Sequence, residues 1–226
     1  MDNYLFTSES VTEGHPDKIA DLVSDSVAYY LINKNESHRA AIETMVSSNM
    51  VTIAGEVKTD LMDNTDSIEK RVRKTVKDIG YEQENFHWNT LSFKNLIHNQ
   101  SVDIARGVDS GGAGDQGMMF GYACNENDSF MPSAIYYSHK ITKALSNARH
   151  SGQEWMGPDG KAQVTVEYSS VNKPLRISNV ICSTQHSEDL KDNPGEVKKR
   201  VEKIIKPELN GCLLYTSDAA DDLWCG

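Results

Sequence analysis

The sequence lacks long hydrophobic runs and basic blocks, and each absence excludes a class of protein. No apolar stretch reaches the roughly 18 residues that a membrane-spanning helix needs, so we expect no transmembrane segment. Residues 1–4 carry no basic leader before an apolar stretch, so no secretory signal is expected. With 33 acidic and 23 basic residues, the net charge of −10 argues against general affinity for nucleic acids or anionic membranes. We therefore expect a cytoplasmic protein without a nucleic-acid or membrane partner.

Cysteine is also scarce, and the last two of the four cysteines fall in an unusual C-terminal segment. Four scattered cysteines are too few for a disulfide framework or a zinc site. Cys124 and Cys182 have apolar neighbours, which is typical of small buried residues. Residues 212–222 resemble the translation of a transposon-end sequencing adapter. We therefore expect residues 212–226 to be a non-native tail and the natural chain to have been cut after Gly211.

The spacing of apolar residues predicts an α+β protein. Helices are expected at residues 16–31, 67–79, 132–149 and 194–205, and strands at residues 41–46, 50–58, 86–97, 118–124, 161–168 and 175–183. The order of elements indicates two related units, each with a strand hairpin and helices on one face of an antiparallel or mixed sheet. The glycine-rich stretch between them, residues 99–114, is the natural boundary.

The first candidate for chemistry is the polar segment of residues 6–18, which leads directly into the first predicted helix. The N-terminus of a helix offers free N–H groups and a positive dipole, both of which suit a phosphate. His15 could donate a hydrogen bond to a phosphate oxygen, and Asp17 could hold a Mg²⁺ ion that bridges phosphates. Ordinary capping of the helix by polar residues is the alternative interpretation.

Glu43 and Glu56 form the second candidate because each interrupts an apolar, β-prone run. Carboxylates are depleted from strand interiors and are costly to bury without a partner. A bound cation or a substrate ammonium group would compensate for that cost. The alternative is that both side chains face outward from a half-solvated sheet.

Two glycine-containing segments complete the candidates. In Gly-Ala-Gly-Asp-Gln-Gly, residues 112–117, the glycines permit close backbone approach and Asp115 could bind an amine, although a glycine hinge explains the pattern equally well. In residues 157–161, Lys161 could pair with a phosphate and Asp159 could hydrogen-bond a nucleoside. The Pro-Asp-Gly sequence is also a common turn.

Together and in this order, these segments resemble the S-adenosylmethionine synthetases (methionine adenosyltransferases). The resemblance covers residues 4–211, includes Ser-Thr-Gln-His-Ser at residues 183–187, and is most specific in Gly-His-Pro-Asp-Lys and Gly-Ala-Gly-Asp-Gln-Gly. It implies that ATP and L-methionine are joined by attack of the methionine sulfur on C5′. The triphosphate is expelled and then hydrolysed to pyrophosphate and phosphate.

The resemblance also implies a role for each candidate residue. His15 would contact the triphosphate near the breaking bond, Asp17 would bind Mg²⁺, and Glu43 would bind an activating K⁺. Glu56 and Gln100 would position methionine, and Asp115 would hold its amino group. The remaining expected ATP contacts are Asp159, Gly160 and Lys161.

The resemblance implies two of the family's three similar domains: an N-terminal domain at residues 1–99, a mobile active-site loop at 100–114 and a central domain at 115–211. The family's third domain supplies basic residues for the triphosphate, and here the tail at 212–226 stands in its place. We therefore expect the complete protein to be a homodimer or a dimer of dimers, and the 226-residue chain to be inactive alone. The competing interpretations are a non-catalytic binding or assembly fragment, or another ATP-dependent enzyme that reuses the two domains.

Overall fold

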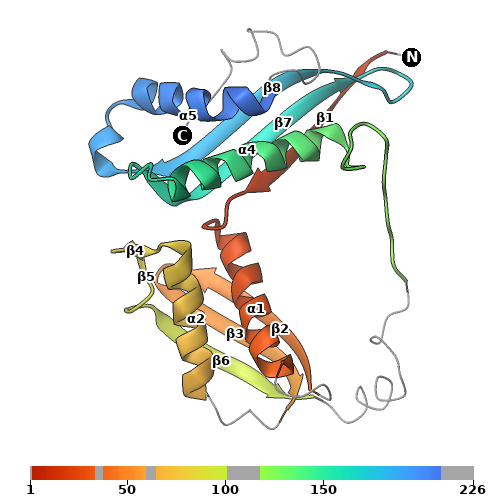
Figure 1. Cartoon of the computed structure of the whole chain (residues 1–226). Helices are drawn as coiled ribbons and strands as arrows, with labels where there is room; N and C mark the ends of the chain where they lie inside the picture. Colours follow the sequence, from red (N-terminus) through yellow and green to blue (C-terminus); the bar gives the residue numbers. More distant parts are fainter. Residues whose placement is uncertain (1, 34–37, 60–64, 101–117, 210–226) are drawn as a thin grey trace. The chain divides into compact units, whose positions relative to one another are not determined.

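The computed structural model describes residues 2–33, 38–59, 65–100 and 118–209 (Figure 1). The chain divides into two compact units, of which one is Pro16–Gly121 and the other joins Met1–His15 to Tyr122–Gly226. Each unit combines a sheet with helices, which confirms the α+β class expected from the sequence. Among the described helices, none has both the length and the apolar character needed to cross a membrane.

The Pro16–Gly121 unit is a three-stranded sheet with two helices on one face (Figure 1). Its elements are α1 (Pro16–Ile32), β2 (Arg39–Ser47), β3 (Met50–Lys58), α2 (Thr65–Ile79), β4 (Glu82–Gln83), β5 (Phe86–His87) and β6 (Ser92–Asn99). The strand order is β2-β3-β6, with β2 and β3 antiparallel and β3 and β6 parallel. The helices bury one apolar stripe each, at Ile19, Val23, Val27 and Leu31 in α1 and at Ile68, Val72, Val76 and Ile79 in α2.

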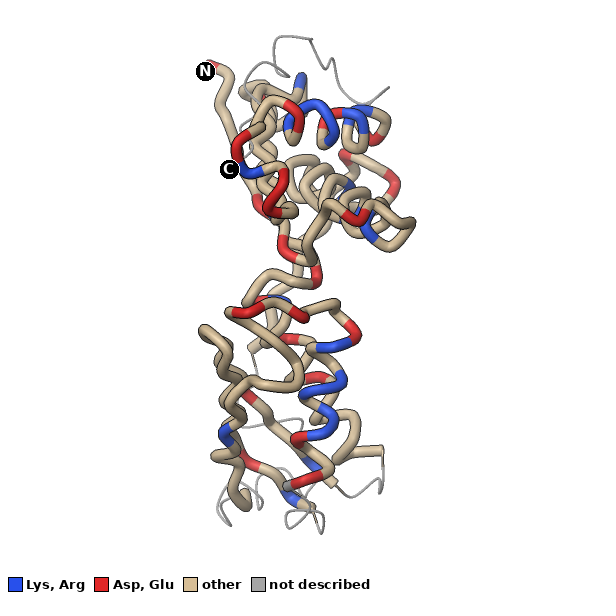
Figure 2. The backbone as a smooth tube through the Cα atoms, turned by 90° about the vertical axis from the view of Figure 1, so that its left-hand side faces the viewer, with Lys and Arg blue, Asp and Glu red and all other residues tan. Residues whose placement is uncertain are grey.

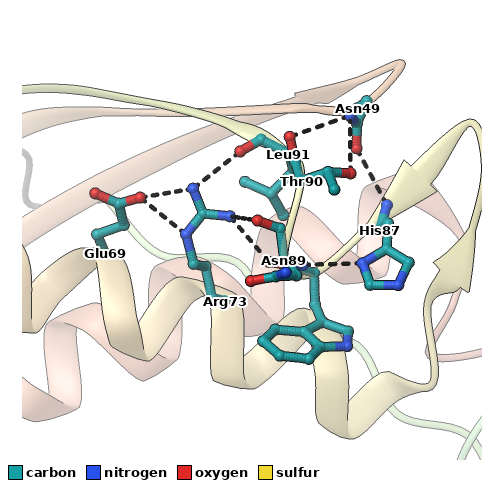
Figure 3. Close-up of polar contacts among 8 residues, drawn as sticks. Asn49, Glu69, Arg73, His87, Asn89, Thr90 and Leu91 are labelled. Atoms are coloured by element: carbon teal, nitrogen blue, oxygen red, sulfur yellow. Dashed lines mark hydrogen bonds and ion pairs between the residues drawn. The ribbon is translucent and has the colours of Figure 1, made fainter.

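Arg73 of α2 fixes the turn that precedes β6 (Figure 3). Its Nη1 donates to the carbonyls of Trp88 and Asn89 at 2.9 and 3.1 Å, and its Nη2 donates to the carbonyl of Leu91 at 3.0 Å. Glu69, one helical turn earlier, accepts from Nε at 2.8 Å and from Nη2 at 2.6 Å. The guanidinium thus donates the hydrogen bonds that a neighbouring strand would otherwise give to these three carbonyls. The chain can therefore turn where the apolar pattern predicts a continuous strand.

The prediction of a single strand at residues 86–97 is therefore wrong in its middle, because β5 and β6 are separate strands. The β2–β3 hairpin holds the same turn from the other side (Figure 3). Asn49, at a φ of 46°, donates through Nδ2 to the Thr90 carbonyl at 3.2 Å and accepts the His87 N–H through Oδ1 at 3.1 Å. Asparagine is one of the few residues that tolerate this left-handed conformation.

The second unit is an antiparallel sheet of order β1-β7-β8, with helices over one face. Its elements are β1 (Tyr4–Val11), α4 (Ser133–His150), β7 (Met156–Tyr168), β8 (Pro174–His186), the 3-10 turn η1 (Glu188–Leu190) and α5 (Pro194–Leu209). Residues Ala162, Val164 and Cys182 point toward the helices and are fully buried. The intervening residues of β7, including Asp159 and Lys161, therefore lie on the opposite face of the sheet.

A partly buried polar contact marks the start of α4. Burial alone would raise the pKa of the Glu126 carboxyl, but hydrogen bonds outweigh burial and hold that pKa below its ordinary value of 4.5. The carboxylate accepts from the Ser133 amide at 2.7 Å and from the Tyr168 hydroxyl at 2.7 Å. It therefore satisfies one of the free N–H groups at the helix N-terminus.

The four predicted helices are confirmed, with ends that differ by a few residues. Cys182 is buried as expected, whereas Cys124 is only partly buried. The strand predicted at residues 118–124 is wrong: the segment forms no strand, and Met118 and Phe120 are 77% and 91% exposed. A β-prone sequence needs a neighbouring strand for its N–H and C=O groups, and this segment has none among the described residues. The expected domain limits at residues 99, 114 and 211 stay predictions, and the last two lie outside the described part.

The first strand is not among the elements predicted from the sequence, where residues 6–18 count as a polar segment before a helix. Strand β1 pairs along its whole length with β7, from Tyr4 opposite Tyr168 to Val11 opposite Lys161. As the edge strand of its sheet it is largely exposed to solvent, apolar Leu5 and Phe6 included, and its residues do not alternate between apolar and polar. Pairing with β7 places residues 4–15 beside a segment that is distant in sequence.

Basic side chains concentrate on two helices, as Figure 2 shows. Helices α2 and α5 carry five Lys or Arg residues each out of 23 in the whole chain. In the second unit, α5 packs on the helix-covered side of the sheet. Its cations are therefore separated from the opposite sheet face, where Asp159 and Lys161 lie.

Candidate functional site

The turn between β1 and α1 is fastened to the first half of β7. The Thr12 N–H donates to the Gly160 carbonyl at 2.8 Å, and the Thr12 hydroxyl donates to the Pro158 carbonyl at 2.8 Å. The Gly14 N–H reaches the same Pro158 carbonyl at 3.1 Å. A Cβ on Gly14 would lie 2.3 Å from the Pro158 carbonyl carbon, so only glycine permits this approach. His15 follows immediately and is thereby placed beside β7.

A pocket of about 360 Å³ opens at this point, lined by His15, Asp159, Gly160, Lys161, Ser183, Thr184 and Gln185. The β7–β8 register explains the grouping, because Gly160 lies opposite Thr184 and Lys161 opposite Ser183. The structure thus brings together all four residues that the sequence analysis expected to contact ATP. The volume falls within the range of small-molecule sites, about 300–1,000 Å³.

The pocket contains a mixture of charges. Burial raises the pKa of the Asp159 carboxyl above its ordinary value, and the charge on His15 and a hydrogen bond from the Gly160 amide only partly oppose this. The Lys161 ammonium lies 2.7 Å from the Glu9 carboxylate of β1. Among the described residues, a single Lys or Arg side chain therefore lines the pocket, and it already has an anionic neighbour.

Glu9, Ser183, Thr184 and Gln185 are residues to which the sequence analysis gave no role. Glu9 becomes visible only once β1 is recognised as a strand in register with β7. Residues 183–187 belong to the family-like pattern, so that pattern was the available signal for β8. The fit of Gln185 depends on Gly157, since a Cβ there would lie 2.4 Å from the Gln185 side-chain oxygen.

Four further predicted residues lie in the described part of the Pro16–Gly121 unit, and two of them lie at the same end of its sheet. Glu56 is half-buried near the end of β3, and its Oε1 lies 3.7 Å from Nε2 of His98 in β6. The Gln100 N–H donates to the Val57 carbonyl at 2.8 Å, while its side-chain Oε1 is buried without a hydrogen-bond partner among the described residues. The parallel β3–β6 pairing therefore brings Glu56 and Gln100 to the same end of the sheet, where both strands finish.

Glu43 is exposed on β2, as the outward-facing alternative supposed. It lies opposite Ala54, and Glu56 lies opposite Ala41, so the two carboxylates share the face that the helices leave uncovered. Asp17 is exposed in the first turn of α1. Asp115 lies outside the described residues.

The described residues contain no ready-made cage of metal ligands. In the described part of the chain, no three His, Cys, Asp or Glu side chains gather as a candidate metal site. Mg²⁺ typically keeps several waters and binds one or two carboxylates together with substrate phosphates. Asp17 therefore fits Mg²⁺ as one ligand beside phosphate oxygens, and Glu43 offers a single oxygen donor to a cation.

Comparisons with known proteins agree with this arrangement of motifs. Residues 3–102 match the N-terminal domain of S-adenosylmethionine synthetase, and residues 110–220 match its central domain. The chain belongs to the S-adenosylmethionine synthetase family. This membership confirms the resemblance seen in the sequence. It leaves the role of each residue as a prediction.

Several bacterial members of the family are close relatives. The S-adenosylmethionine synthase of Rhodospirillum centenum is 48% identical over 209 residues, which cover 90% of this chain and 53% of the relative. Those of Paramagnetospirillum magneticum and Zymomonas mobilis are each 46% identical, covering 93% and 88% of this chain and 54% and 52% of their own lengths. The chain thus spans about half the length of the curated relatives it matches.

Proposed function

We propose that this chain supplies the N-terminal and central parts of an enzyme that makes S-adenosylmethionine from ATP and L-methionine. The observation that carries the proposal is the pocket in which a family motif, Gly-His-Pro-Asp-Lys, places His15 beside Asp159 and Lys161. A sulfur–C5′ bond forms, the bond from C5′ to the triphosphate oxygen breaks, and the oxygen keeps the electron pair. Water then splits the triphosphate into pyrophosphate and phosphate.

The pocket residues would act on the departing triphosphate. His15 would donate a hydrogen bond to the oxygen that gains charge as the bond breaks, which stabilises the transition state more than the substrate. The Lys161 ammonium would leave the Glu9 carboxylate and pair with a phosphate oxygen instead. Asp159 and the Gly160 backbone would hydrogen-bond the remainder of ATP and keep C5′ in line for attack.

The other predicted residues would hold methionine and cations. Glu56 and Gln100 would position methionine, with Asp115 on its amino group, and the buried Gln100 oxygen is an acceptor that supports this assignment. Asp17 would hold Mg²⁺ and Glu43 would hold K⁺. When bound, such cations supply positive charge for the triphosphate that the single pocket lysine does not provide.

The partner we propose is a second copy of the protein, in a cytoplasmic homodimer or dimer of dimers. The uncovered face of the β2–β3–β6 sheet exposes about half of the Met45 and Leu96 side chains. Apolar side chains on an open sheet face are typical of an interface. Their position beside Glu43 supports a site completed by association.

We also propose that the 226-residue chain alone forms no product, because one lysine beside Glu9 and Asp159 leaves a triphosphate poorly neutralised. The test compares this chain with a chimera in which the Rhodospirillum centenum relative supplies the sequence after residue 211. Both are given ATP, methionine, Mg²⁺ and K⁺, and S-adenosylmethionine is measured by mass spectrometry. Product from the chimera alone, lost on His15→Asn, is the expected result. A folded, inactive chimera would contradict the proposed function.

A further inference from the structure

Glu13 occupies the middle of the turn that carries His15, and its carboxylate reaches away from the pocket to the end of α4. Its Oε1 lies 2.6 Å from Nη2 of Arg149 and 2.9 Å from Nε2 of His150. His150 Nε2 is also 3.1 Å from the Arg149 Nη2, and one ring nitrogen can serve only one of these two contacts. The hydrogen bond from Arg149 to Glu13 is therefore kept whichever of the two partners the His150 nitrogen contacts.

This ion pair is more protected from water than most pairs in the described structure. The side chains of Arg149 and Glu13 are 15% and 23% exposed, compared with 39% and 35% for Arg200 and Glu196 on α5. Burial alone would raise the pKa of Glu13, but the hydrogen bond from Arg149 and further hydrogen bonds outweigh it and hold the pKa below 4.5. Glu13 is thus ionised at neutral pH.

Arg149 depends strongly on Glu13. Its Nε is buried and has no hydrogen-bond partner among the described residues, so the Glu13 carboxylate is the principal compensation for a largely buried charge. Removing one partner of such a pair leaves the other charge uncompensated. The two residues are 136 positions apart in the sequence, so their ion pair is a tertiary contact that links the turn after β1 to the end of α4.

The turn is consequently held from two sides. On the β7 side, Thr12 and Gly14 donate hydrogen bonds to the Pro158 and Gly160 carbonyls. On the α4 side, the Glu13 carboxylate contacts the Arg149 guanidinium and the His150 ring. His15 comes two residues after Glu13, at the end of the doubly held turn, and lines the pocket.

We propose that Glu13 and Arg149 form a positioning pair that fixes the orientation of the turn, so that His15 points into the pocket and binds the triphosphate of ATP. Glu13 is a positioning residue because it contacts the α4 terminus rather than the pocket. The choice of ATP as ligand rests on the proposed function. The fastening of His15 does not rest on it.

The test uses Glu13→Gln, which preserves size and removes the charge, in the full 226-residue chain. Calorimetric titration with metal-free ATP is expected to show binding weakened by about tenfold to a hundredfold, as for a misplaced contact group. Arg149→Met should match this loss, and Arg149→Lys should recover part of it. Arg200→Met, which breaks the exposed pair on α5, is the control and should leave ATP binding unchanged.

A double-mutant cycle separates positioning from a general loss of structure. If Glu13 acts through His15, Glu13→Gln will weaken ATP binding in the parent chain but not in a His15→Asn background. Equal weakening in both backgrounds would overturn the proposal.

A second measurement does not depend on ATP. The NMR signals of the His15 ring should shift and broaden in Glu13→Gln and stay unchanged in Arg200→Met. An unchanged His15 signal in Glu13→Gln would refute the positioning role. If the ring responds as expected but the parent chain binds no ATP, the positioning of His15 stands and its proposed contact with ATP in this chain fails, while the proposed function is still decided by the chimera.

Discussion

Replacing Arg73 with methionine should destabilise the Pro16–Gly121 unit through one side chain. Methionine keeps the aliphatic stem but removes three hydrogen bonds to the carbonyls of Trp88, Asn89 and Leu91, and two to Glu69. Hydrogen bonds that involve a charged group each make a net contribution of about 1.5–3 kcal/mol to stability when they are well protected. Water can replace part of them because the Arg73 side chain is 23% exposed. We therefore expect a loss of about 2–4 kcal/mol in the free energy of unfolding.

Trp88 provides a local reporter for this loss. Its ring lies 4.4 Å from the Lys77 ammonium, and its Nε1 donates to Glu82 at 2.9 Å, so its fluorescence should respond when the turn opens. Trp155 and Trp224 would be changed to phenylalanine so that Trp88 is the only tryptophan. Urea titrations of this background and of its Arg73→Met variant then give the two unfolding free energies.

Lys74→Met serves as the matched control, because Lys74 is on the same helix and its pair with Asp78 is exposed. Exposed pairs of this kind contribute about 0.3–0.5 kcal/mol. An Arg73→Met variant that unfolds within about 0.5 kcal/mol of Lys74→Met would refute the reasoning, since the carbonyl contacts would then contribute no more than a surface pair.

Three further predictions concern the second unit. Gly14→Ala places a methyl group 2.3 Å from the Pro158 carbonyl carbon, so calorimetry should detect no ATP binding while circular dichroism still reports a folded chain. Lys161→Met should weaken binding of metal-free ATP about tenfold, and Glu9→Gln should strengthen it severalfold by releasing Lys161, both measured by calorimetry. Because the pKa of Glu126 is held below 4.5, its stabilising contribution is complete above pH 4.5 and is lost as the pH falls through the folded-state value. Glu126→Gln should therefore lower stability at pH 7 and flatten its decline below pH 4.5, as measured by urea titration at each pH.

The helices could be predicted from sequence because each buries a stripe whose spacing is visible without knowledge of its partner. The Val23 and Val27 stripe of α1 and the Val72 and Val76 stripe of α2 are examples. The strands were less predictable. Residues 118–124 have the composition of a strand but no neighbouring strand in the described part of the chain, whereas β1 lacks an apolar–polar alternation and forms a strand because β7 pairs with it.

The candidate site shows the same division between local and distant information. His15, Asp159 and Lys161 could be named from short motifs, yet nothing local indicated that they share one pocket. The pairing of Lys161 with Glu9 follows from the β1–β7 register and could not be read without it. Sequence patterns thus identified the chemical groups but not their electrostatic partners.

The Gly-His-Pro-Asp-Lys motif is specific because contacts beyond the motif constrain its first half. Gly14 is required by the Pro158 backbone, and the neighbouring Thr12 reaches Pro158 across 146 positions. Pro16 and Asp17 instead satisfy local rules for the first turn of a helix, which any helix start could satisfy. The first half of the motif is therefore the more specific half, because its residues must fit against the backbone of β7. For that reason, the geometry around His15 should be more sensitive to changes at residues 157–160 than to changes within α1.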